Sequence, residues 1–349
     1  MKKLAGKKKH YEKGAVLIIV LFIISGLAVV SVELNRNVLL DHAFSITMEA
    51  GLASKPLLKS GESIAAYFLV RDFQKEKNEP GQESLQSLQK RLCEWVEAYS
   101  DRLKKWNLQV EVEDENSRFP LRALFPAYKS EKLRAEYHAG MLENMIVALL
   151  VAHGYEGGEN AAKVCARHYV EQLLAWGGEK VLTDEAARWY KERTPAYYPP
   201  LRAPENISEL LLVYWPDVEQ ELARKVMLGS EEAPGLLDNC SLWSIGPINI
   251  NTMKTVVGWG LCSTLNQAWN FMAELEKGRA AQGEWLRPGW YADIFAAHAV
   301  LAPPANVLGE QSRWFRIRVL ADRGSVQNYS EVVGWMNKTR MTWVSRTVL

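Results

Sequence analysis

Hydrophobic positions at the N-terminal end of the chain predict one long helix. Residues 15–32 contain no charged side chain and are long enough to cross a bilayer core of roughly 30 Å as a helix. Residues 33–74 continue with apolar side chains at helical spacing, for example Ile64 and Phe68. We therefore expect a helix that crosses a membrane and extends beyond it. Pro56 is expected to kink or interrupt this helix, because proline lacks the backbone donor.

Two other stretches alternate between apolar and polar residues, which is typical of half-buried strands. Valines alternate with glutamates in residues 110–113, and residues 114–116 then supply the side chains of an acidic turn. Near the C-terminal end, apolar residues alternate with Arg316 and Arg318, and the pattern continues past a turn at Gly324. This second stretch predicts a meander of three strands.

Between these stretches, residues from about 130 to 285 follow a helical period. Residues 145–153 are strongly apolar, but they are too few to cross a membrane, so we expect a buried core helix there. Another helix is expected at 207–213, with Asn206 and Ser208 at its start.

Charge is distributed unevenly along the chain. Residues 1–14 carry six lysines and one glutamate, so the rest of the chain has a formal charge of −4 against +1 for the whole. An acidic body argues against a protein built to bind nucleic-acid phosphates. Lysines before an apolar segment stay cytoplasmic, which places the remainder across the membrane, in the periplasm of a Gram-negative host. A signal peptide cut among the small residues of 25–32, or a plain uncut anchor, are the alternatives.

The N-terminal segment resembles a known leader. A short basic stretch that ends at Gly14, an apolar segment and a polar helical extension together resemble the class III leader of type IV pilins and type II secretion pseudopilins. The resemblance implies that a prepilin peptidase cuts between Gly14 and Ala15 and that Ala15 is methylated. Most pilins have a glutamate at the fifth mature residue, where this chain has Ile19. That absence resembles the minor pseudopilin family called protein K and suits the tip of a filament.

Internal motifs point to the same family. Residues 108–125 resemble its strand and acidic turn, residues 197–200 its proline-aromatic loop, and Ser312 to Phe315 the start of one of its strands. GPININT resembles its INxNT motif. Asn249 and Asn251 can bond to backbone groups, and Asn251 or Thr252 is expected to cap a helix that starts near Met253.

The resemblance implies an α+β fold in which a pilin-like α/β head with an antiparallel sheet is interrupted by a large inserted α-helical domain. The implied parts are the leader at 1–14, the transmembrane helix at 15–32, the first part of the head at 33–125, the inserted helical domain at 126–300 and the second part of the head at 301–349.

The same resemblance implies a function in protein secretion. The chain is expected to sit in the inner membrane with one span, with most of its mass in the periplasm, and to start the pseudopilus at its tip. Its expected partners are minor pseudopilins I and J, the prepilin peptidase, the pseudopilus with the inner-membrane platform, and exoproteins. Helix packing in the membrane is expected to use Ile19 and the small residues Ser25, Gly26 and Ala28.

Two other classes of function compete with this one. The first is a tip subunit of a type IV pilus or of a DNA-uptake system that uses the same leader. GPININT followed by GWG also resembles the helix-hairpin-helix of DNA-uptake receptors, which hold phosphate on glycine amides. Lys254, Lys277 and Arg279 give only a thin basic surface, so we expect no nucleic-acid partner. The six histidines are scattered without a metal-binding spacing, and no nucleophile or nucleotide motif is present, so we do not expect an enzyme.

Calcium ligands and disulfide bonds are the remaining chemical possibilities. Some relatives bind calcium, and Glu111, Asp114 and Glu115 are the candidate ligands here, although a solvated acidic turn is the preferred interpretation. In an oxidising compartment Cys240 and Cys262, which flank the GPININT motif, are the expected disulfide pair. Cys93 and Cys165 are left open between a second bridge and free thiols. The aromatic loop around Trp285, Trp290 and Tyr291 is interpreted as a loop anchor, with a partner-binding surface as the alternative.

Overall fold

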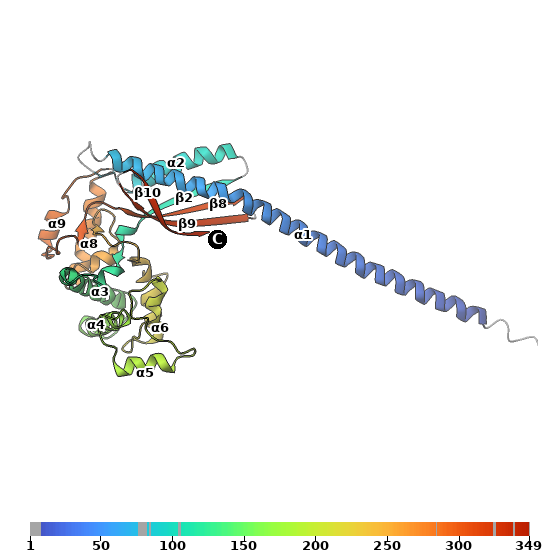
Figure 1. The fold of residues 1–349 in the computed structure, drawn as a ribbon, viewed down its shortest axis with the longest axis horizontal. Helices are drawn as coiled ribbons and strands as arrows, with labels where there is room; N and C mark the ends of the chain where they lie inside the picture. The colour runs from blue at the N-terminus through green and yellow to red at the C-terminus, as the bar shows by residue number, and fades with distance from the viewer. Residues whose placement is uncertain are drawn as a thin grey trace, which may run out of the picture.

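The computed structural model of the chain describes residues 8–75, 82–83, 85–103, 106–283, 285–323, 326–337 and 339–348. A long helix projects from a head that contains the sheet, and a group of shorter helices lies at the opposite end of this sheet (Figure 1). The helices are α1 Lys8–Lys75, α2 Leu85–Leu103, α3 Lys132–Ala152, α4 Gly158–Trp176, α5 Asp184–Glu192, α6 Gln220–Leu228, α7 Thr255–Trp259, α8 Leu265–Ala281 and α9 Ala292–Ala297, with 3-10 turns η1 Glu115–Ser117, η2 Leu121–Leu124, η3 Lys129–Glu131, η4 Ile207–Leu212 and η5 Leu237–Asn239. The strands are β1 Gln82–Glu83, β2 Asn107–Asp114, β3 Phe119–Pro120, β4 Cys240–Ser241, β5 Ile248–Asn249, β6 Trp285–Leu286, β7 Leu308–Gly309, β8 Trp314–Arg323, β9 Val326–Met336 and β10 Met341–Val348.

Helix α1 confirms the prediction of one continuous N-terminal helix. Within the described residues, its segment Val16–Gln74 is the one helix long and apolar enough to cross a membrane. Of the kink or interruption predicted at Pro56, the interruption does not occur, because α1 continues through this position. Pro56 is exposed on the solvent side of α1, whereas Ser54 and Leu58 are buried on the side that faces the head. Packing of that inner side therefore keeps the helix continuous through the missing backbone donor.

The head is a four-stranded antiparallel sheet in the order β10-β9-β8-β2. Helices α1 and α2 lie on the same side of this sheet (Figure 1). The valines of β2 point toward these helices and are buried together with Ile317 and Val319 of β8, so the predicted alternation is confirmed. Gly61 lets α1 come close to the sheet, because a Cβ at this position would lie 2.6 Å from Val319 Cγ1. The C-terminal meander is confirmed as β8, β9 and β10.

The opposite face of the sheet carries a ladder of ion pairs. Arg318 bonds both to Glu113 of β2, at 2.7 Å, and to Glu331 of β9, at 2.9 Å. Arg316 donates to the other oxygen of Glu331 at 2.8 Å. Burial acts to raise the pKa of Glu331, but bonds from Arg318 and Tyr329 and the charge of Arg316 outweigh it, and this pKa is lowered. The ladder joins three strands across their polar side.

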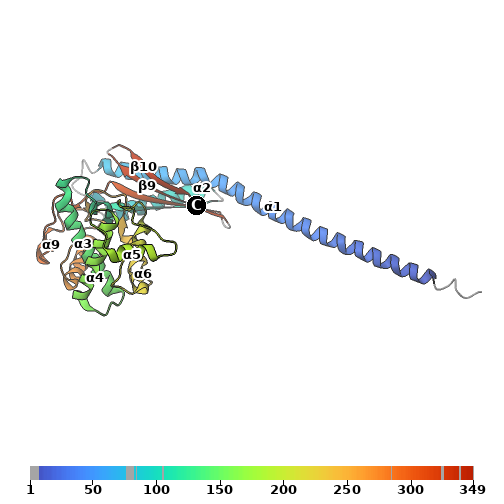
Figure 2. The same ribbon diagram turned by 60° about the horizontal axis from the view of Figure 1, so that its bottom comes forward.

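A second hydrophobic core lies among the helices from α3 to α9, residues 132–297, which we call the helical body. Leu142, Leu149 and Leu150 of α3 are fully buried in it, which confirms a core helix in place of a second membrane span. Helix α3 packs against α4 and α7, and α8 packs against α7 and α9. Both ribbon views show these helices at one end of the sheet, away from the projecting part of α1 (Figures 1 and 2). The start of η4 is fixed by a capping box between Asn206 and Glu209, as the sequence predicted for Asn206, although this helix is of the 3-10 type.

The sheet and the helical body meet where β2 ends and β8 begins. These two ends are neighbours, since Asp114 pairs with Phe315 in the antiparallel register. Two short parallel pairs, β3 with β4 and β5 with β7, lie next to this point along the chain. The chain therefore leaves the sheet and returns to it at the same place.

Candidate functional sites: the stem and the buried junction

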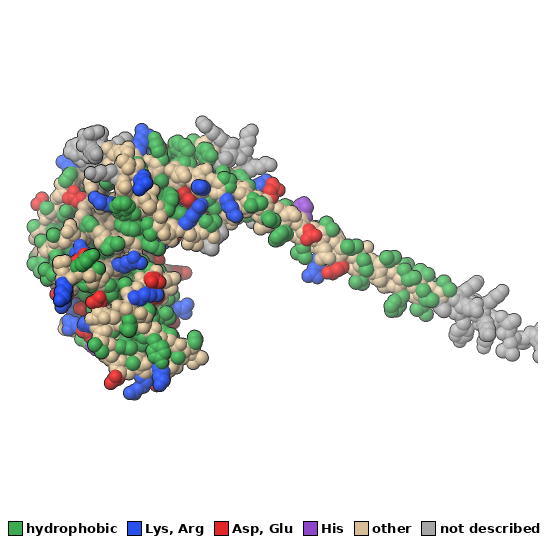
Figure 3. All heavy atoms as spheres, in the orientation of Figure 1, with side chains coloured by type: hydrophobic (Ala, Val, Ile, Leu, Met, Phe, Trp, Pro, Cys, Tyr) green, Lys and Arg blue, Asp and Glu red, His purple; other side chains and the backbone are tan. Residues whose placement is uncertain are grey.

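The first candidate site is the part of α1 that projects from the head, residues 16–49, which we call the stem. Every described side chain of the stem is exposed, and Ala50 is the first buried one. At 1.5 Å per residue the stem is roughly 50 Å long. Hydrophobic side chains cover its outer half (Figure 3), and Phe22 is 81% exposed. Apolar surface of this extent is stable only in lipid or against partner helices.

The predicted assembly residues lie on the stem, but they do not share one face. Ile19 and Gly26 are seven residues apart and lie on the same side, whereas Ala28 is two residues beyond Gly26 and faces the other way. A hollow follows the Gly26 side and is lined by Ile18, Leu21, Phe22, Ser25, Gly26 and Val29. Ser25 Oγ donates to the backbone oxygen of Leu21 at 2.8 Å, so its hydroxyl has a partner within the helix. The predicted cleavage position between Gly14 and Ala15 falls inside the bounds of α1, while residues 1–7 lie outside the described residues.

The second candidate site is a buried polar cluster at the meeting point of head and helical body, which we call the junction. It consists of Asp114, Asn116, Asn249, Thr252 and Ser312. These residues come from the end of β2, from η1, from β5 and the turn after it, and from the segment before β8. Segments that are far apart in the sequence thus meet at one point.

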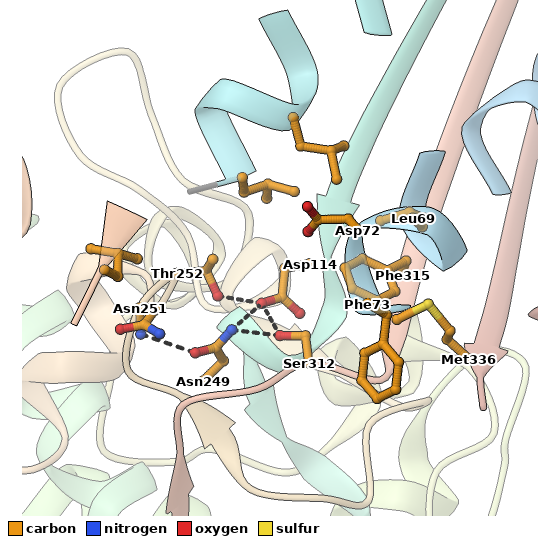
Figure 4. A pocket seen from close by; sticks show the side chains of 13 residues that line it. Leu69, Asp72, Phe73, Asp114, Asn249, Asn251, Thr252, Ser312, Phe315 and Met336 are labelled. Atoms are coloured by element: carbon orange, nitrogen blue, oxygen red, sulfur yellow. Dashed lines mark hydrogen bonds between the residues drawn. The ribbon is translucent and has the colours of Figure 1, made fainter. Parts of the chain in front are cut away.

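Asp114 is the centre of the junction. Its Oδ2 accepts hydrogen bonds from the hydroxyls of Thr252 and Ser312 and from Asn249 Nδ2, the last at 3.1 Å (Figure 4). Its Oδ1 accepts from the backbone N–H of Asn116 at 2.7 Å. Burial raises the pKa of the Asp114 carboxyl, and the hydrogen bonds from Ser312 and Thr252 oppose this increase. The carboxyl is therefore fully bonded but costly to charge.

Asn116 joins the same segments through its side chain. Its Nδ2 donates to Ser244 Oγ at 2.9 Å and to the backbone oxygen of Pro247 at 3.0 Å. Its Oδ1 accepts from the backbone N–H groups of Arg313 and Trp314 at 3.1 and 3.0 Å. The amide therefore uses both of its ends to connect the helical body to the start of β8.

The interpretation of the acidic turn as solvated is wrong for Asp114 and Glu115, which are buried, although Glu111 is exposed. Glu115 is 0% exposed and accepts from Arg316 Nε at 2.6 Å and from Ser241 Oγ at 2.5 Å. Arg118 lies 3.6 Å from the same carboxylate. Cations and hydroxyls contributed by distant segments replace the water that an exposed turn would bind.

The three calcium candidates do not form a calcium site. Glu111 and Asp114 are three positions apart on β2, so they point to opposite faces of the sheet. The Glu111 side chain is 58% exposed beside Arg318, while the oxygens of Asp114 and Glu115 already bond within the chain. Across the described ranges, no three His, Cys, Asp or Glu side chains come together as metal ligands. Calcium needs several oxygens directed at one point, and these carboxylates do not provide them.

The GPININT motif has a different local role from the predicted one. Helix α7 begins at Thr255 after Lys254, so neither Asn251 nor Thr252 caps it. Asn249 Oδ1 instead accepts from the backbone N–H of Asn251 at 3.0 Å, in agreement with the predicted bonding to backbone. Asn251 Oδ1 accepts from Trp290 Nε1 at 2.8 Å. This bond supports the interpretation of the aromatic loop as an anchor; the side chain of Trp285 lies outside the described residues.

The glycines of the α7–α8 hairpin are packed against neighbouring helices. A Cβ on Gly258 would lie 2.0 Å from Met272 Sδ, and one on Gly260 would lie 2.7 Å from the backbone oxygen of Met141. Both glycines therefore serve close packing inside the helical body. Lys254 Nζ donates to the backbone oxygen of Asp238 at 2.9 Å, and Arg279 Nη2 donates to that of Ile250 at 3.0 Å. Two of the three predicted cations are thus bonded within the chain.

The expected disulfide between Cys240 and Cys262 is not formed, and all four cysteines are free thiols. Cys240 lies in β4 beside Phe119, whereas Cys262 lies in the turn after α7 and lines a small hollow with Asn144 and Val147 of α3. Their different surroundings are the physical reason that no bridge joins them. Burial raises the pKa of both thiols to about 12, which makes them inert core residues.

Sequence reasoning missed the partners of the acidic turn. The sequence pattern places Ser312 only at the start of a strand and Arg316 only in an alternating strand, yet Ser312 bonds to Asp114 and Arg316 to Glu115. The position of Asp114 in the sequence does indicate burial. It follows Val110 and Val112 at every second residue of β2, so its side chain points to the same buried face. A carboxylate on a buried phase needs donors from elsewhere in the chain.

Comparison with known proteins gives one kind of match. No family model and no curated protein matches the chain. Among solved structures, a chain of the crystal structure of the GspK-GspI-GspJ complex from the enterotoxigenic Escherichia coli type 2 secretion system matches with a TM-score of 0.52 and 16% sequence identity. The match covers 87% of this chain and 98% of that chain. It confirms the expected α+β fold with its long N-terminal helix, and the chain therefore has a GspK-like minor pseudopilin fold.

Proposed function

We propose that the chain is a minor pseudopilin that assembles at the tip of a type II secretion pseudopilus and takes part in starting it. The observation that carries this proposal is the structural match, because it extends over nearly the whole of both chains, helical body included. This chain combines a long helix, a four-stranded sheet and a helical body in one molecule. Its stem is not covered by the described chain, and such an apolar surface requires partners.

The proposed assembly begins with processing of the leader. Cleavage between Gly14 and Ala15, with methylation of Ala15, leaves the stem as the new N-terminus in the inner membrane and the head in the periplasm. The Gly26 side of the stem packs against the stems of I-type and J-type minor pseudopilins. The structure solved for the similar chain is a complex with GspI and GspJ, which supports this choice of partners.

The proposed tip position follows from Ile19. In most pilins a carboxylate at this place neutralises the terminal amine of a neighbouring subunit, and such a group needs a partner in lipid. Ile19 needs none, so no subunit is required above this one. The inserted helical body adds bulk beyond the sheet and hinders the addition of further subunits (Figure 2). Exported proteins and the inner-membrane platform are then partners of the assembled pseudopilus.

The test is replacement of Gly14 by valine in the native host. The membrane form of the unchanged protein is expected to begin at methylated Ala15, whereas Gly14→Val retains residues 1–14 and abolishes secretion. Intact-mass measurement of the purified chain distinguishes the two forms. Gly51→Ala is the matched control, because a Cβ at Gly51 meets no atom within 4 Å. Recovery of the unchanged protein with its lysine-rich leader still attached would overturn the proposal.

A further inference from the structure

The two edge strands of the head sheet, β2 and β10, differ in whether other parts of the chain bond to their outer backbone groups. At the β2 edge, Gln89 of α2 places its side-chain amide against the strand. Gln89 Nε2 donates to the backbone oxygen of Val110 at 2.8 Å, and Gln89 Oε1 accepts from the backbone N–H of Val112 at 2.9 Å. The amide therefore occupies the positions that a neighbouring strand would use, and this edge is closed.

The β10 edge has no such cover. Strand β10 pairs with β9 on one side, with a β-bulge at Val344 where the register shifts between Trp343 and Ser345. Among the described residues, no other backbone or side chain bonds to the β10 backbone. Its side chains are mostly exposed, with Trp343 at 40%, Val344 at 49% and Val348 at 46%. Met341–Val348 consists largely of residues that favour strands, and Arg346 is its one charged residue. Such an edge is a template for another strand.

The open edge is held in place by the head. Arg346 Nη2 lies 3.0 Å from Glu62 Oε1 of α1, and the Glu62 side chain is only 4% exposed. The same oxygen of Glu62 accepts from Ser330 Oγ of β9 at 2.6 Å. The carboxylate therefore ties α1, β9 and β10 together. A strand fixed in this way loses little conformational entropy when a partner pairs with it.

The position of β10 indicates which partner reaches it. Both ribbon views place the C-terminal end of β10 close to the point where α1 leaves the head and becomes the stem (Figures 1 and 2). A subunit that packs along the stem thus has its own head beside this edge. The closed β2 edge, by contrast, is covered by α2.

We propose that the open edge of β10 adds a strand from a partner minor pseudopilin, so that the two heads share one continuous sheet. This inference rests on the proposed function, because the occupant is the subunit whose stem lies beside this one. Backbone hydrogen bonds give the contact its affinity, and Trp343, Val344 and Val348 supply apolar contacts across the shared sheet.

The test compares two exposed valines in the full chain, co-expressed with its I-type and J-type partners and extracted in detergent. Val344→Lys places a charge on the β10 edge, and Val181→Lys places the same charge on the helical body, where Val181 is 93% exposed. We expect Val344→Lys to reduce recovery of one partner by about tenfold or more, as for loss of a central interface contact. Val181→Lys leaves recovery unchanged. Val348→Lys is the second edge variant.

Amide hydrogen exchange gives the signature of a shared sheet. In the unchanged complex, amides of 341–348 exchange more slowly than in the chain alone, while those of 107–114 exchange at the same rate in both samples. Equal thermal unfolding of the valine variants checks that both fold. Partner recovery and exchange unaffected by Val344→Lys and Val348→Lys overturn strand addition and leave the proposed function standing.

Two other results are also decisive. If the unchanged chain alone is a dimer that Val344→Lys dissociates, the edge binds a second copy and the proposed occupant is wrong. If the unchanged chain recovers neither partner, the proposed function fails and the docking proposal fails with it.

Discussion

The stem and the junction break the usual arrangement of polar and apolar groups in opposite ways. The stem exposes isoleucines, leucines and phenylalanines on every side, and the junction buries a carboxylate, two asparagines and a serine. The difference is in where the partners are. Junction side chains find theirs within the same chain, whereas no part of the described chain covers the stem. Buried polar groups therefore define the internal architecture, and exposed apolar groups indicate contacts outside the molecule.

Substitutions in the junction and in the stem are expected to affect different properties of the protein. Junction residues bond to groups on other segments, and the loss of Asp114 or Asn116 leaves several donors or acceptors without partners. Stem residues make few contacts within the monomer, so their substitution leaves the folded chain almost unchanged. Variants of the junction are expected to act on stability, and variants of the stem on assembly.

The largest effect on stability is expected for Asp114→Ala. This change leaves the hydroxyls of Thr252 and Ser312 and the backbone N–H of Asn116 without their acceptor. Asn249 Nδ2 loses one of its two acceptors and keeps Ser312 Oγ. We expect the free energy of unfolding to fall by about 3 kcal/mol or more, the range for a broken buried polar network. Urea unfolding of the detergent-solubilised chain, followed by tryptophan fluorescence, measures it.

Glu111→Ala is the control for Asp114→Ala, because Glu111 lies on the same strand with its side chain 58% exposed. Its effect should stay within about 0.5 kcal/mol, as for other surface substitutions. Equal decreases in the free energy of unfolding for the two variants would show that the junction contributes no more to stability than an exposed residue. The contrast with the stem would then be lost.

A smaller effect is expected from pH. The pKa of Asp114 is raised from its model-compound value of 3.8, so in the pH window just above that value the folded chain binds a proton that the unfolded chain has released. Stability from this group therefore decreases as pH rises through the window, by at most about 1.4 kcal/mol per pH unit. Asp114→Asn removes this component. The unfolding free energy of the unchanged chain minus that of Asp114→Asn should become less favourable with rising pH.

Glu331 is expected to give the opposite dependence of stability on pH from Asp114. Its pKa is lowered, so its contribution is present above about pH 4.5 and is lost as pH falls through the lowered pKa. The slopes from Asp114 and Glu331 have opposite signs and lie on opposite sides of the ordinary carboxyl range. A difference curve for Asp114→Asn that is flat above pH 4 would contradict the raised pKa.

The smallest effect on unfolding is expected for the stem. A Cβ at Gly26 meets no atom within 4 Å, so Gly26→Leu is expected to leave the urea midpoint unchanged. The added side chain fills the hollow between Phe22 and Val29 and prevents close helix packing. Recovery of partner subunits should therefore fall. Ala28→Leu, on the opposite side of the helix, is the matched variant, and equal losses for both would refute a single packing face.

Much of the fold was predictable because its segments carry their own patterns. The uncharged run of 15–32 and its helical continuation predict α1, and the alternation in 110–113 and 315–319 predicts β2 and β8. The expectation that Pro56 kinks or interrupts α1 rests on local propensity, and the interruption is absent because the inner side of the helix is packed against the head. The cap at Asn251 or Thr252 was wrong because those side chains bond to distant groups instead.

The candidate sites differ in the same respect. The stem is visible in the sequence, since hydrophobicity and length are properties of one segment. The junction is not, because Asp114 and Ser312 are 198 positions apart and only the folded chain brings them together. Spacing to the asparagine motif likewise suggested a bridge between Cys240 and Cys262, whereas the fold places them in different surroundings.

The sequence by itself determined the long helix, the apolar stem, the alternating strands and the helical character of the middle. Each of these follows from the periodic exposure of one segment to water or lipid, which neighbouring residues already encode. Tertiary structure alone decided that the acidic turn is buried, that Gln89 closes one edge of the sheet and that β10 stays open. These features depend on which donors and acceptors meet after folding, and hydrogen bonds across long sequence separations have no local signature.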